Sequence, residues 1–293
     1  MTTLSTIQGL GTTWWIEIFD EISKESEQVV YDDLFAFITH FDSKYSRFQS
    51  ESDISILNDT RHLLKPSRET LDLLHYGLTL YHETNGVFNF LVGEKMVQTG
   101  YDALYSFTPK GDSVLTPDPT HTLTLHEDKI LLTLGQIDIG GYGKGYLIDL
   151  IAARLTDKHG LKEFLLNGGG DMYATAEHGK PLVIYLEHPT IPNTYVAQTT
   201  LFYEGFAASS THKRHWENNG KTYSHIIDTK NGESSLSGLG VFVKAPTARA
   251  ADAWATTLVI SAPDNHTTTM ATHHIKAALF DEHEKTILWY GDF

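Results

Sequence analysis

The chain has 293 residues, of which 41% are hydrophobic and 20% are charged, as in an ordinary globular protein with a sizeable core. Its 22 lysines and arginines stand against 37 aspartates and glutamates, and a net charge of −15 argues against nucleic-acid or anionic-membrane partners. The chain contains no cysteine, which excludes disulfides, thiolate metal sites and cysteine nucleophiles.

The first third of the chain predicts one strand and three helices. Residues 13–19 (TWWIEIF) alternate as a strand does, and apolar residues recur at helical spacing over 29–45. A short helix follows a cap near Ser52, and a long helix begins at Pro66-Ser67 and stops at Asn85-Gly86. Residues 87–120, rich in proline and glycine, predict a long functional loop rather than a linker.

The rest of the chain predicts mainly strands. A hairpin over 122–134 turns at Glu127-Asp128, and a second turns at 218–220, with 221–228 as its second arm. Further strands are expected over 163–167, 182–188, 195–203, 205–209 and 238–245, a helix over 251–261, and a closing hairpin over 277–291. Long helices with antiparallel strands, without regular β-α-β alternation, predict an α+β fold, and no boundary divides 1–293 into more than one domain.

Residues 136–155 are the stretch around which a ligand is expected to bind. Ile137 and Ile139 predict a strand, and the residues after 145 recur at helical spacing. Four glycines and one cation lie between them: Gly140, Gly141, Gly143, Gly145 and Lys144. Such a turn can form an anion site, because glycine allows close approach of the backbone and the first N–H groups of a helix lack partners. An ordinary strand-to-helix connection is the alternative.

Asp252 and Thr256 stand four residues apart on the predicted helix, so both side chains project from one face. A carboxylate and a hydroxyl beside a phosphate are hard oxygen ligands suited to Mg²⁺. The alternative is an aspartate near the start of a helix, with a threonine that bonds back to its own turn.

His225 and Asp228 lie where a predicted strand meets a turn at Asn231-Gly232. The histidine can accept a proton from an attacking hydroxyl, and the aspartate can orient it or bind metal. The alternative is that both belong to an ordinary hairpin end. Gly168 to Asp171 offers a second close approach of the backbone or a flexible strand end. Four rings in polar loops can stack on a planar ligand or cover the core: Phe48, Phe88, Tyr101 and Tyr105.

Seven motifs, in order, resemble those of the ApbE-type flavin transferases, which move FMN from FAD onto a threonine or serine of a target protein. They are Gly11-Thr12 before Trp15, SRFQSESDISILN (46–58), GVFN (86–89), IDIGGYGKGYLID (137–149), LLNGGGDMYA (165–174), YSHIIDTKNGE (223–233) and ADAWATTL (251–258). The resemblance covers most of the chain and implies an ApbE-like, T-fold-like architecture, with antiparallel sheets flanked by helices.

The resemblance also implies roles for individual residues. Mg²⁺ would be held by Asp252, Thr256 and the backbone carbonyl of Gly143. FAD, as the substrate, would contact Phe48, Val87, Phe88, Asn89, Gly140, Gly141, Lys144, Tyr146 and Ile226. His225 and Asp228 would lie beside the pyrophosphate, and either can be the base.

Several positions depart from the family pattern. Gly143 replaces the commoner alanine, Asn89 an aspartate and Thr229 a proline, and Ser210 stands where a Ser-Gly pair is usual. The first residues, MTTLSTIQGLGTT, contain no basic segment followed by an apolar one, and no lipobox cysteine is present. We therefore expect a protein of the cytoplasmic branch, with no membrane or nucleic-acid partner.

Three functions fit these motifs. The first is Mg²⁺-dependent transfer of FMN from FAD to an acceptor flavoprotein that carries a Thr/Ser flavinylation motif, with release of AMP. The second is Mg²⁺-dependent hydrolysis of FAD to FMN and AMP, in which water replaces the hydroxyl. The third is non-catalytic binding of FAD. Release of AMP with and without an acceptor distinguishes them.

Overall fold

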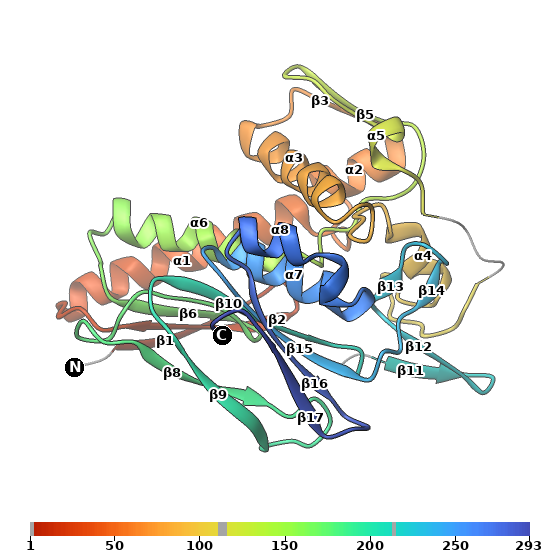
Figure 1. Cartoon of the computed structure of the whole chain (residues 1–293). Helices are drawn as coiled ribbons and strands as arrows, with labels where there is room; N and C mark the ends of the chain where they lie inside the picture. Colours follow the sequence, from red (N-terminus) through yellow and green to blue (C-terminus); the bar gives the residue numbers. More distant parts are fainter. Residues whose placement is uncertain (1–2, 111–115, 213–214) are drawn as a thin grey trace.

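The structure is a computed structural model that describes residues 3–110, 116–212 and 215–293. An antiparallel sheet of eight strands forms its centre (Figure 1). In spatial order the strands are β1 (Thr3–Gly9), β2 (Thr12–Ile18), β6 (Phe164–Gly168), β7 (Asp171–Ala174), β10 (Glu204–Ser210), β15 (Leu239–Ala245), β16 (Lys276–Asp281) and β17 (Thr286–Tyr290). The predicted α+β class is confirmed.

Helices cover one face of this sheet, as Figure 1 shows for α1 (Lys24–Tyr45), α6 (Gly143–Asp157) and α7 (Ala248–Ile260). A hairpin of β8 (Leu182–Glu187) and β9 (Tyr195–Leu201) packs on the other face. The alternation within strands decides which side chains face the helices. In β2, Trp14 and Ile16 join the helix-side core, which places Trp15 on the opposite face.

A second group of elements packs beside the N-terminal start of α6. It contains α2 (Asp53–Thr60), α3 (Arg68–Glu83), α5 (Pro119–Thr122) and a small sheet in the order β3 (His62–Leu64), β5 (Lys129–Leu132), β4 (Leu123–Leu125). Ser52 and Ser67 cap α2 and α3, each accepting a backbone N–H three residues ahead. The predicted start points of these helices and the hairpin over 122–134 are confirmed.

The remaining elements are short. The segment predicted to be irregular contains α4 (Gly93–Gln98), which lies near the hairpins β11 (His215–Asn218) with β12 (Lys221–Ser224) and β13 (Ile227–Asp228) with β14 (Glu233–Ser234). A 3-10 turn (Pro263–Asn265) and α8 (Thr267–Thr272) follow α7. Across the three described ranges, no helix has the length and apolarity needed to cross a bilayer.

Candidate functional site

The segment before the glycines is not a strand, so that prediction was wrong. It is extended, but its only bridge is between Gln136 and Val92, within the described part of the chain. The buried side chain of Asn58 replaces a strand partner: its Nδ2 donates to the Ile137 carbonyl at 3.0 Å and its Oδ1 accepts the Ile137 N–H at 2.7 Å. Asp138 N–H donates to the Phe90 carbonyl at 2.8 Å. These bonds satisfy buried backbone groups without a sheet.

The glycines serve close packing rather than unusual backbone angles. None of the four described glycines at 140, 141, 143 and 145 has a positive φ. A Cβ on Gly145 would lie 2.4 Å from the Ala248 carbonyl oxygen, and one on Gly141 would lie 3.1 Å from the Phe88 ring and 3.4 Å from the Thr256 methyl. The glycines therefore let α6 begin directly against α7 and against the loop that carries Phe88.

Helices α6 and α7 cap each other. Asp252 of α7 accepts the Gly145 N–H through Oδ2 at 2.9 Å, and Asp149 of α6 accepts the N–H groups of Ala248 and Arg249 at 2.8 and 3.1 Å. Each carboxylate satisfies N–H groups that the first turn of a helix leaves open. Burial nevertheless raises the pKa of Asp149 to about 6, against these two bonds.

Lys144 lies between two buried carboxylates in the first turn of α6. Its ammonium forms an ion pair with Asp171, at the start of β7, and lies 3.7 Å from Asp252 Oδ1. Asp171 and Asp252 are only 3% and 5% exposed. One lysine beside two carboxylates leaves a formal charge of −1 in a buried place, and a further cation would compensate that charge.

Thr256 lies one turn beyond Asp252 and is half-buried, with its methyl group close to Gly141. In the neighbouring position, Thr257 donates its hydroxyl back to the Ala253 carbonyl at 2.8 Å. Among the residues that the structure describes, the Thr256 hydroxyl makes no such bond. The threonine that bonds back to its own turn is therefore Thr257. Thr256 remains a candidate metal ligand.

Asp252 and Thr256 fit a cation that takes few protein ligands. Within residues 3–110, 116–212 and 215–293, no group of three or more histidine, cysteine, aspartate or glutamate side chains could hold a metal ion. A cation at Asp252 would therefore complete its coordination with hydroxyl, carbonyl, phosphate and water oxygens, which is the habit of Mg²⁺.

The candidate contacts for a flavin come from three segments. Val87 and Phe88 are buried, and the Thr229 hydroxyl donates to the Gly86 and Val87 carbonyls at 2.9 and 3.0 Å. Asn89 Nδ2 donates to the Pro117 carbonyl and its Oδ1 accepts the Leu91 N–H, both at 2.9 Å. Asn89 and Thr229, which both depart from the family pattern, thus stabilise the loop that follows α3.

Phe48 is half-exposed, whereas Ile226 and Tyr146 are buried. Phe48 lies in a group of rings with Tyr101 and Tyr105, at centroid distances of 6.3 and 5.5 Å. The Tyr101 ring is in turn 6.3 Å from the ring of His225. The structure therefore brings Phe48, a candidate flavin contact, and His225, a candidate base, close to the ring of one tyrosine.

The Asp228 side chain makes hydrogen bonds within its own turn. Its Oδ1 accepts the Lys230 N–H at 2.9 Å and its Oδ2 accepts the Asn231 Nδ2 amide at 2.8 Å, which closes the turn between β13 and β14. Both carboxylate oxygens of Asp228 are therefore engaged within this turn.

A cavity of about 400 Å³ lies on the opposite face of the large sheet, next to the β8–β9 hairpin. Its lining includes Trp15, Tyr185 and Phe206, together with Gly169 and Gly170 of the glycine-rich strand end. The candidate metal ligands, bases and flavin contacts are absent from this lining, and Lys144 and Asp252 lie on α6 and α7, which cover the other face.

Sequence reasoning missed Asn58, Asp149 and the pair of Arg47 with Asp138. Arg47 forms a buried ion pair with Asp138, whose Oδ1 accepts the Gly140 N–H at 2.6 Å. Both Asp138 and Asp149 lie within the glycine-rich motif, so position in that motif was the available signal.

The ApbE family model matches residues 10–280. The FAD:protein FMN transferase of Haemophilus influenzae is 24% identical over 282 residues, which cover 87% of this chain and 79% of that protein. The protein of the same description from Escherichia coli K12 is 26% identical over 278 residues, covering 87% and 77%.

Solved structures of the same family have this fold. The ApbE protein from Thermotoga maritima superimposes with a TM-score of 0.89 at 18% identity, covering 99% of this chain and 97% of that chain. The flavinyl transferase ApbE from Pseudomonas stutzeri gives 0.84 at 19% identity, covering 99% and 95%. The expected ApbE-like architecture is confirmed. Because the family model extends over most of its length, this chain belongs to the ApbE family.

Proposed function

We propose that this chain is an Mg²⁺-dependent, cytoplasmic FAD:protein FMN transferase, which esterifies a threonine or serine of an acceptor protein and releases AMP. Family membership and the function named for the relatives support the reaction class. The observation that carries the proposal to these residues is the junction of α6 and α7, where Lys144 lies 3.7 Å from Asp252 and Asp252 accepts the Gly145 N–H.

In the proposed reaction, the acceptor hydroxyl oxygen forms a bond to the FMN phosphorus of FAD while the P–O bond to AMP breaks. The hydroxyl proton passes to His225, and AMP leaves as the phosphate monoester. Lys144, in the first turn of α6, binds the pyrophosphate oxygens, because transfer of this kind depends on positioning and charge stabilisation.

Asp252, Thr256 and the Gly143 carbonyl would hold Mg²⁺. When bound, the ion supplies neutralisation of the charge that develops on the departing phosphate. Phe48, the Val87–Asn89 segment, Gly140, Gly141, Tyr146 and Ile226 would line the place for FAD.

Co-expression with an acceptor flavoprotein tests the proposal. The acceptor should gain one FMN unit by mass and stay fluorescent after denaturation, and the signal should disappear when its acceptor threonine is replaced by alanine. The Asp252→Ala variant should lose the product while keeping its fold, as judged by circular dichroism. AMP release without any modified acceptor would instead establish the hydrolase, and FAD binding without AMP release would establish non-catalytic binding of FAD.

A further inference from the structure

Arg47 is a buried cation to which the proposed function gives no role. Its side chain is 9% exposed, and its Nε forms an ion pair with Asp138 while Nη2 donates to the Tyr101 carbonyl at 2.9 Å. The guanidinium carbon Cζ lies 4.2 Å from the centre of the ring of Phe48, the next residue in the chain. Arg47 therefore joins two segments that are distant from it in the sequence, and both approach the candidate site.

The first segment is the glycine turn. Asp138 accepts from Arg47 through Oδ2 and from the Gly140 N–H through Oδ1. A buried ion pair stabilises a structure only when its remaining hydrogen-bonding positions are filled, and these two bonds fill both carboxylate oxygens. The position of Gly140 is thus coupled to that of Arg47.

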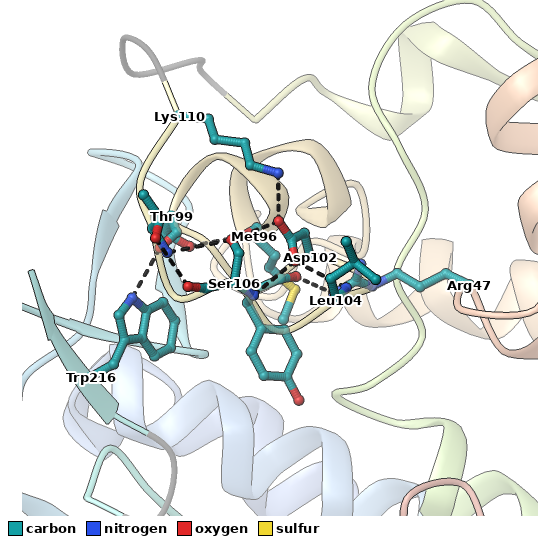
Figure 2. Close-up of polar contacts among 10 residues, drawn as sticks. Arg47, Met96, Thr99, Asp102, Leu104, Ser106, Lys110 and Trp216 are labelled. Carbon is teal, nitrogen blue, oxygen red and sulfur yellow. Dashed lines mark hydrogen bonds and ion pairs between the residues drawn. The ribbon is translucent and has the colours of Figure 1, made fainter.

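The second segment is the loop after α4, which is internally braced (Figure 2). Asp102 accepts the N–H groups of Leu104 and Ser106 at 3.1 and 3.0 Å and pairs with Lys110 at 2.5 Å. Trp216 Nε1 donates to the Thr99 carbonyl at 3.0 Å. Arg47 and Trp216 reach this loop from opposite sides in Figure 2. These contacts hold the loop together, and Arg47 joins it to the glycine turn.

The third contact is with the ring wall, which Phe48 forms with two residues of this same loop, Tyr101 and Tyr105. Arg47 holds the backbone of Tyr101 and the ring of Phe48 at the same time. Only a planar guanidinium offers two donors at a fixed angle together with a face that packs on an aromatic ring. A lysine carries its donors on one nitrogen and has neither the planar fork nor the flat face, so it cannot reproduce all of these contacts together.

We propose that Arg47 is a positioning residue that fixes this ring wall relative to the glycine turn, so that the flavin ring and its phosphate are held in one geometry. The inference rests on the proposed function, because it takes Phe48 as the contact for the flavin ring and Gly140 as a phosphate contact.

The test compares Arg47→Lys with the wild type by calorimetric titration in buffer with Mg²⁺, using FMN and ADP as separate probes. FMN binding should weaken about tenfold, because the ring wall is no longer held by the guanidinium fork. ADP lacks the flavin ring and meets the start of α6, which Asp252 still holds, so its affinity should change less than about threefold. In turnover, KM for FAD should rise about tenfold with kcat nearly unchanged, since binding is lost equally before and during reaction.

A second arginine in the chain provides a matched control. Arg154 donates through Nε and Nη2 to Asp33, both at 2.6 Å, and its guanidinium lies 4.8 Å from the Phe37 ring. It lies nine residues beyond Gly145 on α6, roughly 14 Å along the helix. Arg154→Lys makes the same chemical change and should lower the melting temperature similarly, with both ligands bound as in the wild type.

Phe48→Leu is a second test, which remains usable if Arg47→Lys does not fold. Phe48 is 37% exposed, so replacing its ring should destabilise the fold less than replacing the buried Arg47. This variant should also weaken FMN but not ADP, and the double variant should lose less than the two single effects combined. Equal losses for FMN and ADP, unchanged FMN binding, or the same loss in Arg154→Lys would each refute the positioning role. A wild type that binds FMN in this Arg47-dependent way but modifies no acceptor would refute the transfer function alone.

Discussion

Gly145→Ala is the substitution that most directly tests the contact between α6 and α7. The new methyl would lie 2.4 Å from the Ala248 carbonyl oxygen and 2.7 Å from the Arg249 Cα, about 1 Å inside the ordinary contact distance of 3.4 Å. Both obstacles are backbone atoms at the start of α7, so the two helices must separate rather than a side chain rotate. The same separation lengthens the 2.9 Å bond from the Gly145 N–H to Asp252.

Two effects on stability oppose each other in this variant. Overpacking typically costs about 1–3 kcal/mol, whereas replacing a helical glycine by alanine returns about 1 kcal/mol. We expect a net loss of up to about 2 kcal/mol and a fall of a few degrees in melting temperature. A hydrogen bond to a charged group contributes about 1.5–3 kcal/mol, so loss of the Asp252 geometry should lower kcat/KM by roughly 10- to 100-fold.

The control is Gly160→Ala, after the other end of α6. Gly160 has a φ of +69° and open space around it, so alanine there costs stability through backbone strain alone, by about 1–2 kcal/mol. The two variants should show similar losses of melting temperature in thermal melts. Only Gly145→Ala should lower kcat/KM for AMP release from FAD. If Gly145→Ala kept wild-type kcat/KM, or if Gly160→Ala lost as much, the α6–α7 contact would not be what positions Asp252.

Three further predictions use other contacts. Asp149→Asn tests pH dependence: burial raises the pKa of Asp149 from 3.8 to about 6, so its contribution to stability is greatest below pH 4 and falls as the pH rises through 6. Denaturant unfolding at several pH values should show that the free energy of unfolding of the wild type, relative to that of the variant, declines as the pH rises. The decline should reach up to about 3 kcal/mol, since one pKa unit corresponds to about 1.4 kcal/mol. A difference that stays constant between pH 4 and 7 would contradict this. Asn58→Leu leaves the buried Ile137 N–H and carbonyl unpaired and should destabilise the fold by about 2–5 kcal/mol in urea unfolding, a loss below 1 kcal/mol being evidence against the bracing role. Thr229→Val removes the hydroxyl that donates to Gly86 and Val87 and should weaken FAD binding severalfold in calorimetry, with about 1 kcal/mol lost in stability. Unchanged FAD affinity in that variant would show that the segment at Gly86 and Val87 is not part of the FAD site.

Local signals determined the elements that need no distant partner. The caps at Ser52 and Ser67 and the turn at 218–220 follow from side chains within three residues of the backbone groups that they satisfy. The order of the motifs was enough to indicate the family, because it depends on residue types along the chain and not on packing. Asp252 and Thr256 share a helix face for the same local reason.

Tertiary structure decided what partners the remaining groups have. The alternation at Ile137 and Ile139 predicted a strand, but Asn58, 79 residues earlier in the chain, takes the hydrogen bonds that a neighbouring strand would have made. The glycines looked suited to a turn, and only the approach of Ala248 showed that Gly145 is a packing position.

The same holds for the charged groups of the site. Asp252 bonds to Gly145 across 107 residues, and Arg47 pairs with Asp138 across 91. Periodicity reports which face of a helix or strand is apolar, but it carries no information about which distant donor meets which acceptor. These pairings are set when all buried polar groups must find partners in one compact structure. For this reason Asp252 and His225 could be predicted from the sequence, whereas the contacts of Asp149 and Arg47 could be identified only in the folded chain.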